Sequence, residues 1–389
     1  MSRASPEQPA PEETRVLPYG RQSISEDDVA AVVEVLRGDW LTTGPAVGRF
    51  EEALSARAGA PAVAVSSGTA ALHTAYAAAG IGVGDEIVTS PMTFVATAST
   101  AAMLGATVVF ADVEPDTGNL DVEAAAAAMT RATAAIVGVD YAGHPVDTDA
   151  LSRLAHDSGA LFIEDAAHSI GGTWRGRPVG SLADVTAFSF YPTKNLTTAE
   201  GGAITSLDDG LLERARRFRN HGLVRDPAEQ REPRAGGWHQ EVHEFGLNYR
   251  LPDVLCALGI SQLARLDELK SRRGRIVAAY DEAFRGIDAV SAPVCREGAD
   301  PMWHLYALRV HDDRRRQLYD ALRAQGILVQ VNYLPAHLHP VFEDLGYRRG
   351  MFPRAEQFYA QQLSLPLFPA MTDEDVERVI SAVRSFFGP

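Results

Sequence analysis

Three features are scarce in this sequence of 389 residues: cysteine, excess positive charge and long apolar runs. Cys256 and Cys295 are the only cysteines, and their spacing suits neither a disulfide framework nor a zinc site. The net charge of −15 would repel nucleic acids and anionic membranes, although local arginines leave room for a small anionic substrate. No apolar run of about twenty residues predicts a membrane span. A reducing cytoplasm fits this composition.

The length and the apolar content of the chain limit the number of domains that it can form. With 46% hydrophobic residues, the chain is long enough for two domains, each with its own core. The sequence begins MSRASPEQPAPEETR, which lacks an apolar core, so we expect a disordered tail over 1–16 rather than a signal peptide. A large domain over 17–255 and a small domain over 256–389 are expected to follow.

Short β-rich runs alternate with alanine-rich helical runs between residues 62 and 205. This alternation predicts an α/β domain, in which helices cover both faces of one large seven-stranded mixed sheet. The predicted strands are Ala62–Val65, Glu86–Thr89, Thr107–Phe110, Ala134–Val139, Ala160–Glu164, Asp184–Phe188 and Gly202–Thr205. The predicted helices between them span 69–79, 95–104, 121–129 and 148–158.

Outside this sheet the pattern is helical or irregular. Ser25 is the expected N-cap of a helix that stops at Gly38, and residues 39–45 are expected to form an exposed loop. Residues 225–245 are charged and aperiodic, which indicates a mobile excursion. The small domain is expected to be α+β, with a helix over 252–285, strands His304–Val310 and Ile327–Val331, and helices over 312–325, 354–362 and 372–386.

Lys194 is the chemical centre of the sequence, because it follows an apolar strand in the loop FSFYPTKNLTTAEGG at 188–202. Taken alone, a loop lysine is usually a solvated surface charge. Here, partial burial would lower the lysine pKa and free an amine that can attack a carbonyl group. Gly201 and Gly202 are expected to turn the chain tightly, because glycine tolerates positive φ.

Ser66-Ser67-Gly68-Thr69-Ala70 follows a predicted strand and opens a predicted helix. Its backbone N–H groups, its hydroxyls and the helix dipole would converge on one point, where a phosphate would bind. Considered alone, however, such a motif more often only caps the helix through a serine.

Glu164 ends the fifth predicted strand and Asp165 directly follows it, at the edge where open α/β sheets bind ligands. Neighbouring strand residues point in opposite directions, so only one carboxylate faces a site, where it needs a cationic partner. A protonated pyridine nitrogen would be such a partner, and a helix N-cap is the alternative role of Asp165. Phe94 follows another strand and offers a face for a flat cofactor, although a core position is its commoner use.

A phosphate cup, an aromatic shelf, a carboxylate for a ring nitrogen and a lysine thus all follow predicted strands. Together they describe a site for pyridoxal 5′-phosphate (PLP). The histidine pairs His239/His243 and His337/His339 lack a third ligand, so we expect no metal site and assign them surface or substrate-contact roles.

Nine ordered sequence blocks stand out: LTTGP (41–45), SSGTAALH (66–73), GDEIVTSPMTFVATA (84–98), DYAGHPVD (140–147), EDAAHS (164–169), FSFYPTKNLTTAEGGAI (188–204), FRNHG (218–222), NYRL (248–251) and SLPLFP (364–369). Over about residues 17–386 they resemble the DegT/StrS-type sugar-nucleotide aminotransferases, a family of the fold-type I PLP superfamily. Among its subgroups, GDWLTTGP, VDYAG and TTAEGGA resemble first the UDP-4-keto-6-deoxy-hexosamine C4 aminotransferase of pseudaminic acid biosynthesis and next the L-Ara4N-type C4 aminotransferases.

The resemblance implies a role for each residue of the ring site. Lys194 would hold the cofactor as a Schiff base and Asp165 would pair with the pyridine nitrogen. Phe94 would stack on the ring and His168 would lie beside it.

Four further residues match the phosphate positions of the family. Gly68, Thr69 and Ser189 would bind the phosphate from within the chain. Asn248 matches an asparagine that relatives contribute from the neighbouring subunit, which implies a homodimer with shared sites.

The resemblance also implies a reaction in which L-glutamate donates its amino group to the 4-keto carbon of a nucleotide-linked 6-deoxyhexose. The chain departs from the family at Asn332, since relatives commonly carry histidine before Tyr333, in a segment that lines their sugar-nucleotide side. Three alternatives remain: a TDP-linked or 3-keto sugar as substrate, a dehydratase, which commonly replaces the lysine by histidine, and a non-enzymatic regulator on the same fold.

Overall fold

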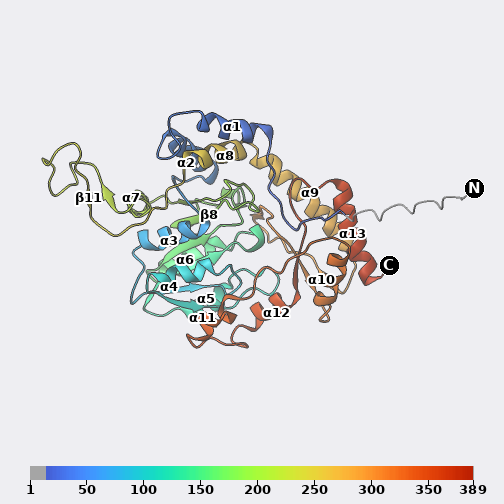
Figure 1. The fold of residues 1–389 in the computed structure, drawn as a ribbon. Coiled ribbons are helices and arrows are strands. Elements are labelled where there is room, and N and C mark those ends of the chain that lie inside the picture. The colour runs from blue at the N-terminus through green and yellow to red at the C-terminus, as the bar shows by residue number, and fades with distance from the viewer. Residues whose placement is uncertain (1–14, 389) are drawn as a thin grey trace, which may run out of the picture.

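The computed structural model describes residues 15–388, and the predicted tail lies almost entirely outside them. A seven-stranded sheet forms the centre of the molecule (Figure 1), in the order β1-β9-β8-β5-β4-β2-β3. Its strands are β1 (Ala62–Val65), β2 (Glu86–Thr89), β3 (Thr107–Phe110), β4 (Thr133–Val139), β5 (Leu161–Asp165), β8 (Val185–Ser189) and β9 (Gly202–Thr205). The predicted sheet is confirmed, with each strand end within one residue of its expected position.

Strand direction brings the functional segments together. β3, β2, β4, β5 and β8 are mutually parallel, whereas β9 runs antiparallel to both of its neighbours, β8 and β1. The carboxyl ends of six strands therefore meet at one edge of a mixed sheet. Open α/β sheets bind their ligands at such an edge.

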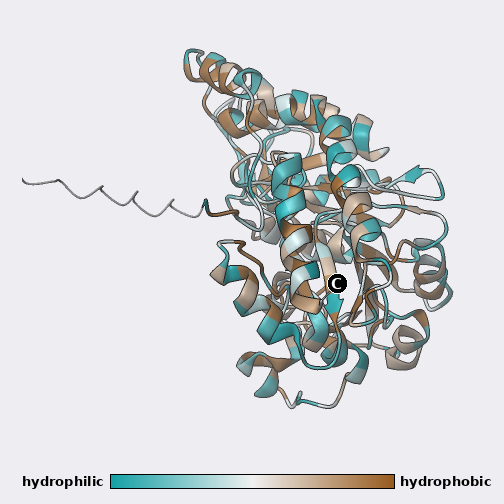
Figure 2. Ribbon diagram, turned by 90° about the vertical axis from the view of Figure 1, so that its right-hand side faces the viewer, coloured by the Kyte–Doolittle hydropathy of each residue, from teal (hydrophilic) through white to brown (hydrophobic). Residues whose placement is uncertain are grey.

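Helices cover this sheet as the alternating pattern predicted (Figure 1). The helix α3 packs against β8 and β9, and α6 packs against β4 and β5. The helices α3 (Gly68–Ala78), α4 (Ala96–Met103) and α7 (Asp209–Phe218) share one buried cluster with the sheet, and α5 (Val122–Ala128) and α6 (Thr148–Asp157) share another. In Figure 2 the helices carry hydrophilic and hydrophobic segments side by side, as helices on the surface of a core do.

A further helical layer, α1 (Glu26–Leu36), α2 (Pro45–Ala58) and α8 (Asp253–Ala264), packs beside the sheet. The expected N-cap Ser25 is confirmed, since it forms a capping box with Asp28. The predicted loop ends at Pro45, where α2 begins. The first turn of α2 is capped from α8, because the Asp253 carboxylate accepts the Gly44 and Ala46 N–H groups at 2.8 and 2.9 Å. Residues 39–58 contain no side chain that signals this cap, and the sequence therefore did not predict α2.

The C-terminal part packs helices on a three-stranded sheet of order β12-β14-β15. Its elements are α9 (Leu266–Phe284), β12 (Val290–Ser291), β14 (Tyr306–Val310), α10 (Arg315–Ala324), α11 (Pro340–Glu343), α12 (Pro353–Gln361), β15 (Gln362–Leu365) and α13 (Asp373–Phe387). The single helix expected over 252–285 is wrong: it breaks at Arg265, whose φ and ψ are −105° and 5°. Because α8 packs on α1 and α2, the domain boundary at 255 stays a prediction.

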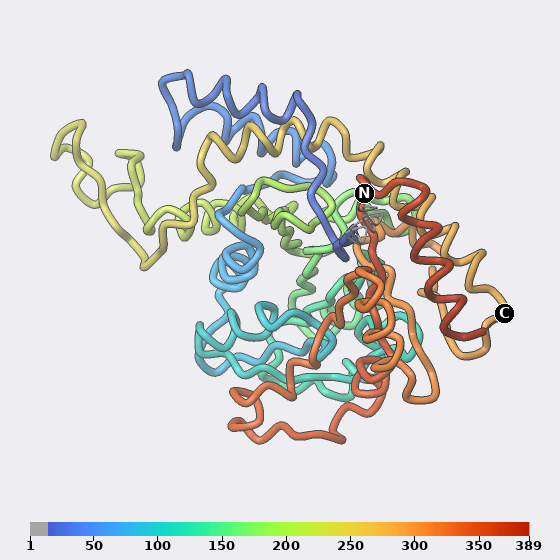
Figure 3. The backbone as a smooth tube through the Cα atoms, turned by 45° about the vertical axis from the view of Figure 1, so that its right-hand side comes forward, coloured from blue at the N-terminus to red at the C-terminus, as the bar shows by residue number. Residues whose placement is uncertain are grey.

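The predicted strand Ile327–Val331 is also wrong. Ile327 forms a single parallel bridge to Leu17, and Gln330 forms a single antiparallel bridge to Ser364. The two ends of this segment therefore pair with different neighbours, and no continuous ladder forms. Figure 3 shows the N-terminal segment descending to the C-terminal segments, where Leu17 lies in their core.

An arm over residues 219–248 projects from the body (Figures 1 and 3). It contains a short ladder of β10 (Leu223–Val224) and β11 (Glu241–Val242). The Glu241 carboxylate accepts the backbone N–H groups of Arg231 and Glu232 and contacts His239 and His243. Trp238 and Phe245 are exposed at 85% and 98%, so the arm buries little of its own apolar surface. The predicted mobility of 225–245 stays a prediction.

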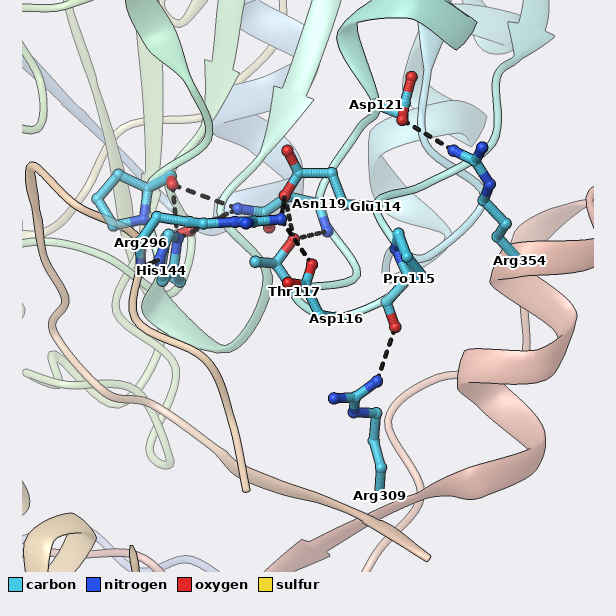
Figure 4. A network of polar contacts seen from close by, with 11 residues as sticks. Glu114, Pro115, Asp116, Thr117, Asn119, Asp121, His144, Arg296, Arg309 and Arg354 are labelled. Atoms are coloured by element: carbon cyan, nitrogen blue, oxygen red, sulfur yellow. Dashed lines mark hydrogen bonds and ion pairs between the residues drawn. The ribbon is translucent and has the colours of Figure 1, made fainter. Parts of the chain in front are cut away.

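Arginines of the C-terminal part bind an acidic loop of the large sheet domain (Figure 4). Arg296 pairs with Asp116 at 2.8 Å, Arg309 donates to the Pro115 carbonyl at 2.9 Å, and Arg354 pairs with Asp121 at 2.8 Å. A smaller sheet, β13 (Ala299–Asp300) with β6 (Thr173–Trp174) and β7 (Arg177–Pro178), joins the same two parts of the chain. The two parts are thus linked by both main-chain and side-chain contacts.

No helix within residues 15–388 combines the length and the apolar character that crossing a membrane requires.

The short helix η1 (Tyr141–Gly143) connects the sheet edge to the segment before β14. Met302 N donates to the Gly143 carbonyl at 3.1 Å and His304 N donates to the Ala142 carbonyl at 2.8 Å. Gly143 has a φ of +91°, and a Cβ atom there would overlap the Met302 carbonyl oxygen.

Gly143→Ala is therefore expected to lower the free energy of unfolding by more than about 3 kcal/mol, because overlap with main chain adds to left-handed strain. Gly159→Ala is the matched control: its φ is +75° and a Cβ meets no atom within 4 Å. It should lose only about 1 kcal/mol. Urea unfolding followed by circular dichroism compares the two, and equal losses would contradict the overlap.

Candidate active site

One cavity of about 440 Å³ opens at the carboxyl edge of the sheet. The segments after β1, β2 and β4, the ends of β5 and β8, and the loop that carries Lys194 all line it. Seven of the eight residues predicted for the site lie in its wall: Gly68, Thr69, Phe94, Asp165, His168, Ser189 and Lys194. Asn248 does not line this cavity; it lies exposed in the arm.

The Lys194 loop is held at both ends by main-chain hydrogen bonds. Phe190 N donates to Gly201 O at 2.8 Å, and Thr198 N donates to Phe190 O at 3.0 Å. The expected reason for the glycines is wrong, since the left-handed residue of this loop is Ala199, with φ of +65°. Gly202 is required instead by close approach, because a Cβ atom there would overlap the main chain of Ser67.

Asp165 ends β5 and faces the cavity. Its Oδ2 accepts from the Thr97 hydroxyl at 2.5 Å and its Oδ1 accepts from the Ala167 N–H at 3.1 Å. Glu164 faces the other side of the strand, where it is fully buried and accepts from the Thr186 hydroxyl at 3.1 Å. The expectation that only one of the two carboxylates faces the site is confirmed.

Lys194 and Asp165 influence each other's charge. Burial lowers the pKa of Lys194 to about 8, although the nearby Asp165 charge opposes this fall. Burial raises the pKa of Asp165, against the hydrogen bonds from Thr97 and Ala167 and the charge of Lys194. A substantial fraction of Lys194 is therefore neutral near physiological pH, as nucleophilic attack requires.

Two histidine rings lie together in the cavity wall. The His168 and His304 ring centroids are 4.2 Å apart, and His168 Nε2 lies 3.2 Å from the Tyr333 hydroxyl. Burial, reinforced by the charge of Lys194, holds the pKa of His168 well below its ordinary value. His168 is therefore neutral at physiological pH.

The phosphate cup forms where β1 passes into α3. Ser67 caps the helix, and its hydroxyl accepts the Ala70 N–H at 3.0 Å, so the capping role is real. Gly68 and Thr69 open the helix, where backbone N–H groups lack intrahelical acceptors. A Cβ on Gly68 would lie 2.6 Å from Ser189 Cβ, so the glycine lets β8 approach the cup. Capping and anion binding are thus compatible here.

Phe94 stands at the mouth of the cavity with 56% of its surface exposed. Its ring meets the Tyr333 ring edge to face, at 5.8 Å between centroids. A core position, the commoner use of phenylalanine, is thus excluded for this residue.

Other cavity residues were not assigned to the site from the sequence: Tyr19, Asp140, Tyr141 and His304. Tyr19 lies before the first helix, and its neighbour Leu17 pairs with Ile327 more than 300 residues away. No local pattern predicts such a contact. Asp140 follows a predicted strand as Asp165 does, which was a usable signal.

The cavity suits PLP in three respects. The helix opening at Gly68 and Thr69 suits a phosphate. The Asp165 carboxylate accepts hydrogen bonds from two neutral donors, the Thr97 hydroxyl and the Ala167 N–H, so a protonated ring nitrogen would complete its pairing. His168 Nδ1 is buried with no hydrogen-bond partner within the described chain, so the wall has a free polar atom beside the ring position.

Fold and cavity together define a PLP-dependent aminotransferase of fold-type I, and comparison with known proteins identifies the family. The family model described as "DegT/DnrJ/EryC1/StrS aminotransferase family" matches residues 22–384. The chain belongs to this family. It is a sugar aminotransferase that uses PLP.

Individual relatives extend over nearly the whole chain. The spore coat polysaccharide biosynthesis protein SpsC of Bacillus subtilis is 41% identical over 375 residues, which cover 95% of this chain and 96% of that protein. The putative sugar aminotransferase Spr1654 from Streptococcus pneumoniae, in its PMP form, superimposes with a TM-score of 0.90 at 30% identity, covering 95% of this chain and 99% of that one. Helicobacter pylori PseC, an aminotransferase of pseudoaminic acid biosynthesis, gives 0.89 at 31% identity, covering 96% and 99%.

The charge state of Lys194 can be measured directly, because the chain contains only one other lysine, Lys270. In cofactor-free protein, labelling of Lys194 by an amine reagent should be half-maximal near pH 8, since only the neutral amine reacts. Asp165→Asn should lower this midpoint, because the charge that raises the lysine pKa is removed. Peptide mass spectrometry quantifies both lysines in one sample. If Lys194 and Lys270 titrate together, burial does not control Lys194.

Proposed function

We propose that this protein transfers the amino group of L-glutamate to the 4-keto carbon of a nucleotide-linked 6-deoxyhexose. The preferred substrate is UDP-2-acetamido-2,6-dideoxy-β-L-arabino-hexos-4-ulose, and its product is UDP-4-amino-4,6-dideoxy-N-acetyl-β-L-altrosamine. The observation that carries the reaction is the half-buried Lys194 beside Asp165 in a cavity with a helix-opening phosphate cup. The similarity to PseC supports the substrate.

Each residue has a proposed part. Bound PLP supplies a carbonyl group that carries nitrogen and a ring that takes up electrons. Lys194 would hold the cofactor through its carbonyl carbon, and its Nζ would take up and return a proton within each half-reaction, first with glutamate and then with the sugar. Asp165 keeps the ring nitrogen protonated, and neutral His168 contacts the ring edge. Phe94 covers one face of the ring.

The phosphate has a separate set of contacts. The Gly68 and Thr69 amides and the Ser189 hydroxyl bind it from within the chain. Because these donors are neutral, the negative charge of the phosphate would be stabilised mainly by the helix dipole, whose positive end lies at the start of α3.

We further propose a homodimer, located in the cytoplasm, in which Asn248 completes the partner's phosphate site. Three observations support the shared site. Asn248 is exposed and lies outside its own cavity, its arm projects from the body, and the arm exposes Trp238 and Phe245. A symmetric dimer uses such a contact twice and so forms two equivalent sites.

A substrate panel tests the proposed reaction. Purified protein is incubated with glutamate and with UDP- and TDP-linked 4-keto sugars, and products are identified by mass spectrometry. We expect the UDP-linked N-acetyl sugar to be aminated fastest. Lys194→Ala should abolish turnover and borohydride fixation of the cofactor, whereas Lys270→Ala, the matched control, should retain both. Turnover by Lys194→Ala, or conversion of a TDP-linked sugar alone, would overturn the mechanism or the substrate, respectively.

Subunit complementation tests the shared site. Lys194→Ala and Asn248→Asp subunits, each inactive alone, are mixed under exchange conditions. One site of the heterodimer then carries both changes and the other neither, so activity should return to as much as half the wild-type value per dimer. Wild-type subunits mixed with Lys194→Ala provide the reference. If native mass spectrometry shows heterodimers and no activity returns, Asn248 does not act across the interface.

A further inference from the structure

Asp140 is a carboxyl group in the cavity wall for which neither the family resemblance nor the proposed roles provide a function. It directly follows β4, whose last residue, Val139, is the register partner of Asp165 in β5. The Asp140 backbone N–H donates to the Asp165 carbonyl oxygen at 3.1 Å. The two acidic residues therefore stand on neighbouring strand ends at the same edge of the sheet.

The Asp140 side chain is fully buried and fixed at both oxygens. Oδ1 accepts from the Val146 N–H at 2.9 Å, and Oδ2 accepts from the Ser169 hydroxyl. Both donors are neutral. Asp140 is thus held in one place without a cation to stabilise its charge.

Glu164 adds a third buried carboxyl group. One of its oxygens accepts from Thr186, and Oε1 is buried with no partner among the described residues. The titratable groups that act on Asp140 are its fellow carboxyls Glu164 and Asp165, and the nearby cation Lys194 acts on Asp165. Three carboxylates in a dry region with one lysine cannot all be ionised together.

The protons are distributed unequally over this cluster. Burial raises the pKa of Asp140 to about 7, with a smaller contribution from the Asp165 charge and against the hydrogen bonds from Ser169 and Val146. Burial, with repulsion from Asp140, raises the pKa of Glu164 well above its ordinary value. Asp140 is therefore the member that exchanges its proton near neutrality, while Glu164 stays protonated.

We propose that Asp140 is a positioning residue: its carboxyl group, held on the neighbouring strand end, sets the charge next to Asp165. It binds a proton below neutrality and releases it above neutrality. The released proton leaves a negative charge on Asp140. This second charge strengthens the retention of the proton that Asp165 holds on the cofactor ring nitrogen, because loss of that proton would leave more unbalanced charge. The inference rests on the role proposed for Asp165. The charged Asp140 carboxylate would keep the ring nitrogen protonated at alkaline pH, where the neutral Lys194 amine is also most abundant.

A purely structural role is the alternative, because Asp140 also fixes the loop that returns to Val146. The two roles differ in pH dependence. A structural role changes stability or activity equally at every pH, whereas the proposed role requires a titration that belongs to Asp140.

Three variants of the full-length holoenzyme separate them. Infrared spectroscopy should show a protonated carboxyl band in the wild type that is lost near pH 7, together with a shift in cofactor absorption. Asp140→Asn should abolish this step. Ser169→Ala should move it to higher pH, because the hydroxyl stabilises the carboxylate. Glu164→Gln, the matched control, should leave it unchanged. A step that persists in Asp140→Asn, or that disappears in Glu164→Gln, overturns the proposal.

Thermal stability provides a second measurement. An unfolded aspartate loses its proton near pH 4, about three pH units below folded Asp140, so the folded state binds more protons between these values. The corresponding stability is present at low pH and is lost as the pH rises through 7. The Tm of Asp140→Asn should therefore rise relative to wild type between about pH 4 and about pH 7, and the difference should level off above that range. A constant difference would overturn the proposal. Neither measurement needs glutamate or sugar, so a wrong substrate assignment leaves both tests valid.

Discussion

Loss of water around Lys194 and Asp165 is the constraint on which the rest of the site depends. Charged groups lose hydration when they are buried, so each is stable only with a counter-charge or in its neutral form. The sheet brings the two together from the ends of β5 and β8. The same burial keeps His168 neutral and favours the protonated form of Glu164, the neighbour of Asp165 in β5. The chemistry of the cavity is therefore set by how the sheet edge excludes water.

Local sequence signals predicted the sheet and most of the cavity because both are built from strand ends. A strand that ends in a polar residue at the carboxyl edge is visible in a short window, as at Asp165 and Ser189. The chain has only two lysines, Lys194 and Lys270, so its surface charge is carried almost entirely by other residues. This scarcity is a further sequence signal that favours a specific role for Lys194.

Features set by distant contacts were not visible in the sequence. Residues 327–331 are rich in β-branched and apolar residues, like a strand, yet the bridges of this segment are to Leu17 and Ser364. His304 belongs to the site because the Ala142 carbonyl binds its backbone and its ring lies against His168. Gly202 also illustrates the limit: glycine was expected there, but the reason is the main chain of Ser67 and not its own φ. Each of these features depends on a residue distant in the sequence, so it becomes visible only when the folded structure is known.

The cap of α2 has a consequence for how the chain folds. Two backbone N–H groups at the start of this helix are satisfied by Asp253, a residue more than 200 positions later. Contacts of such sequence separation form slowly, since a long loop must close before they stabilise anything. During synthesis, the helix at residues 45–58 acquires its final cap only after the whole large sheet has left the ribosome. The start of α2 therefore cannot become native until α8 has been made, although α2 is synthesised about 200 residues earlier.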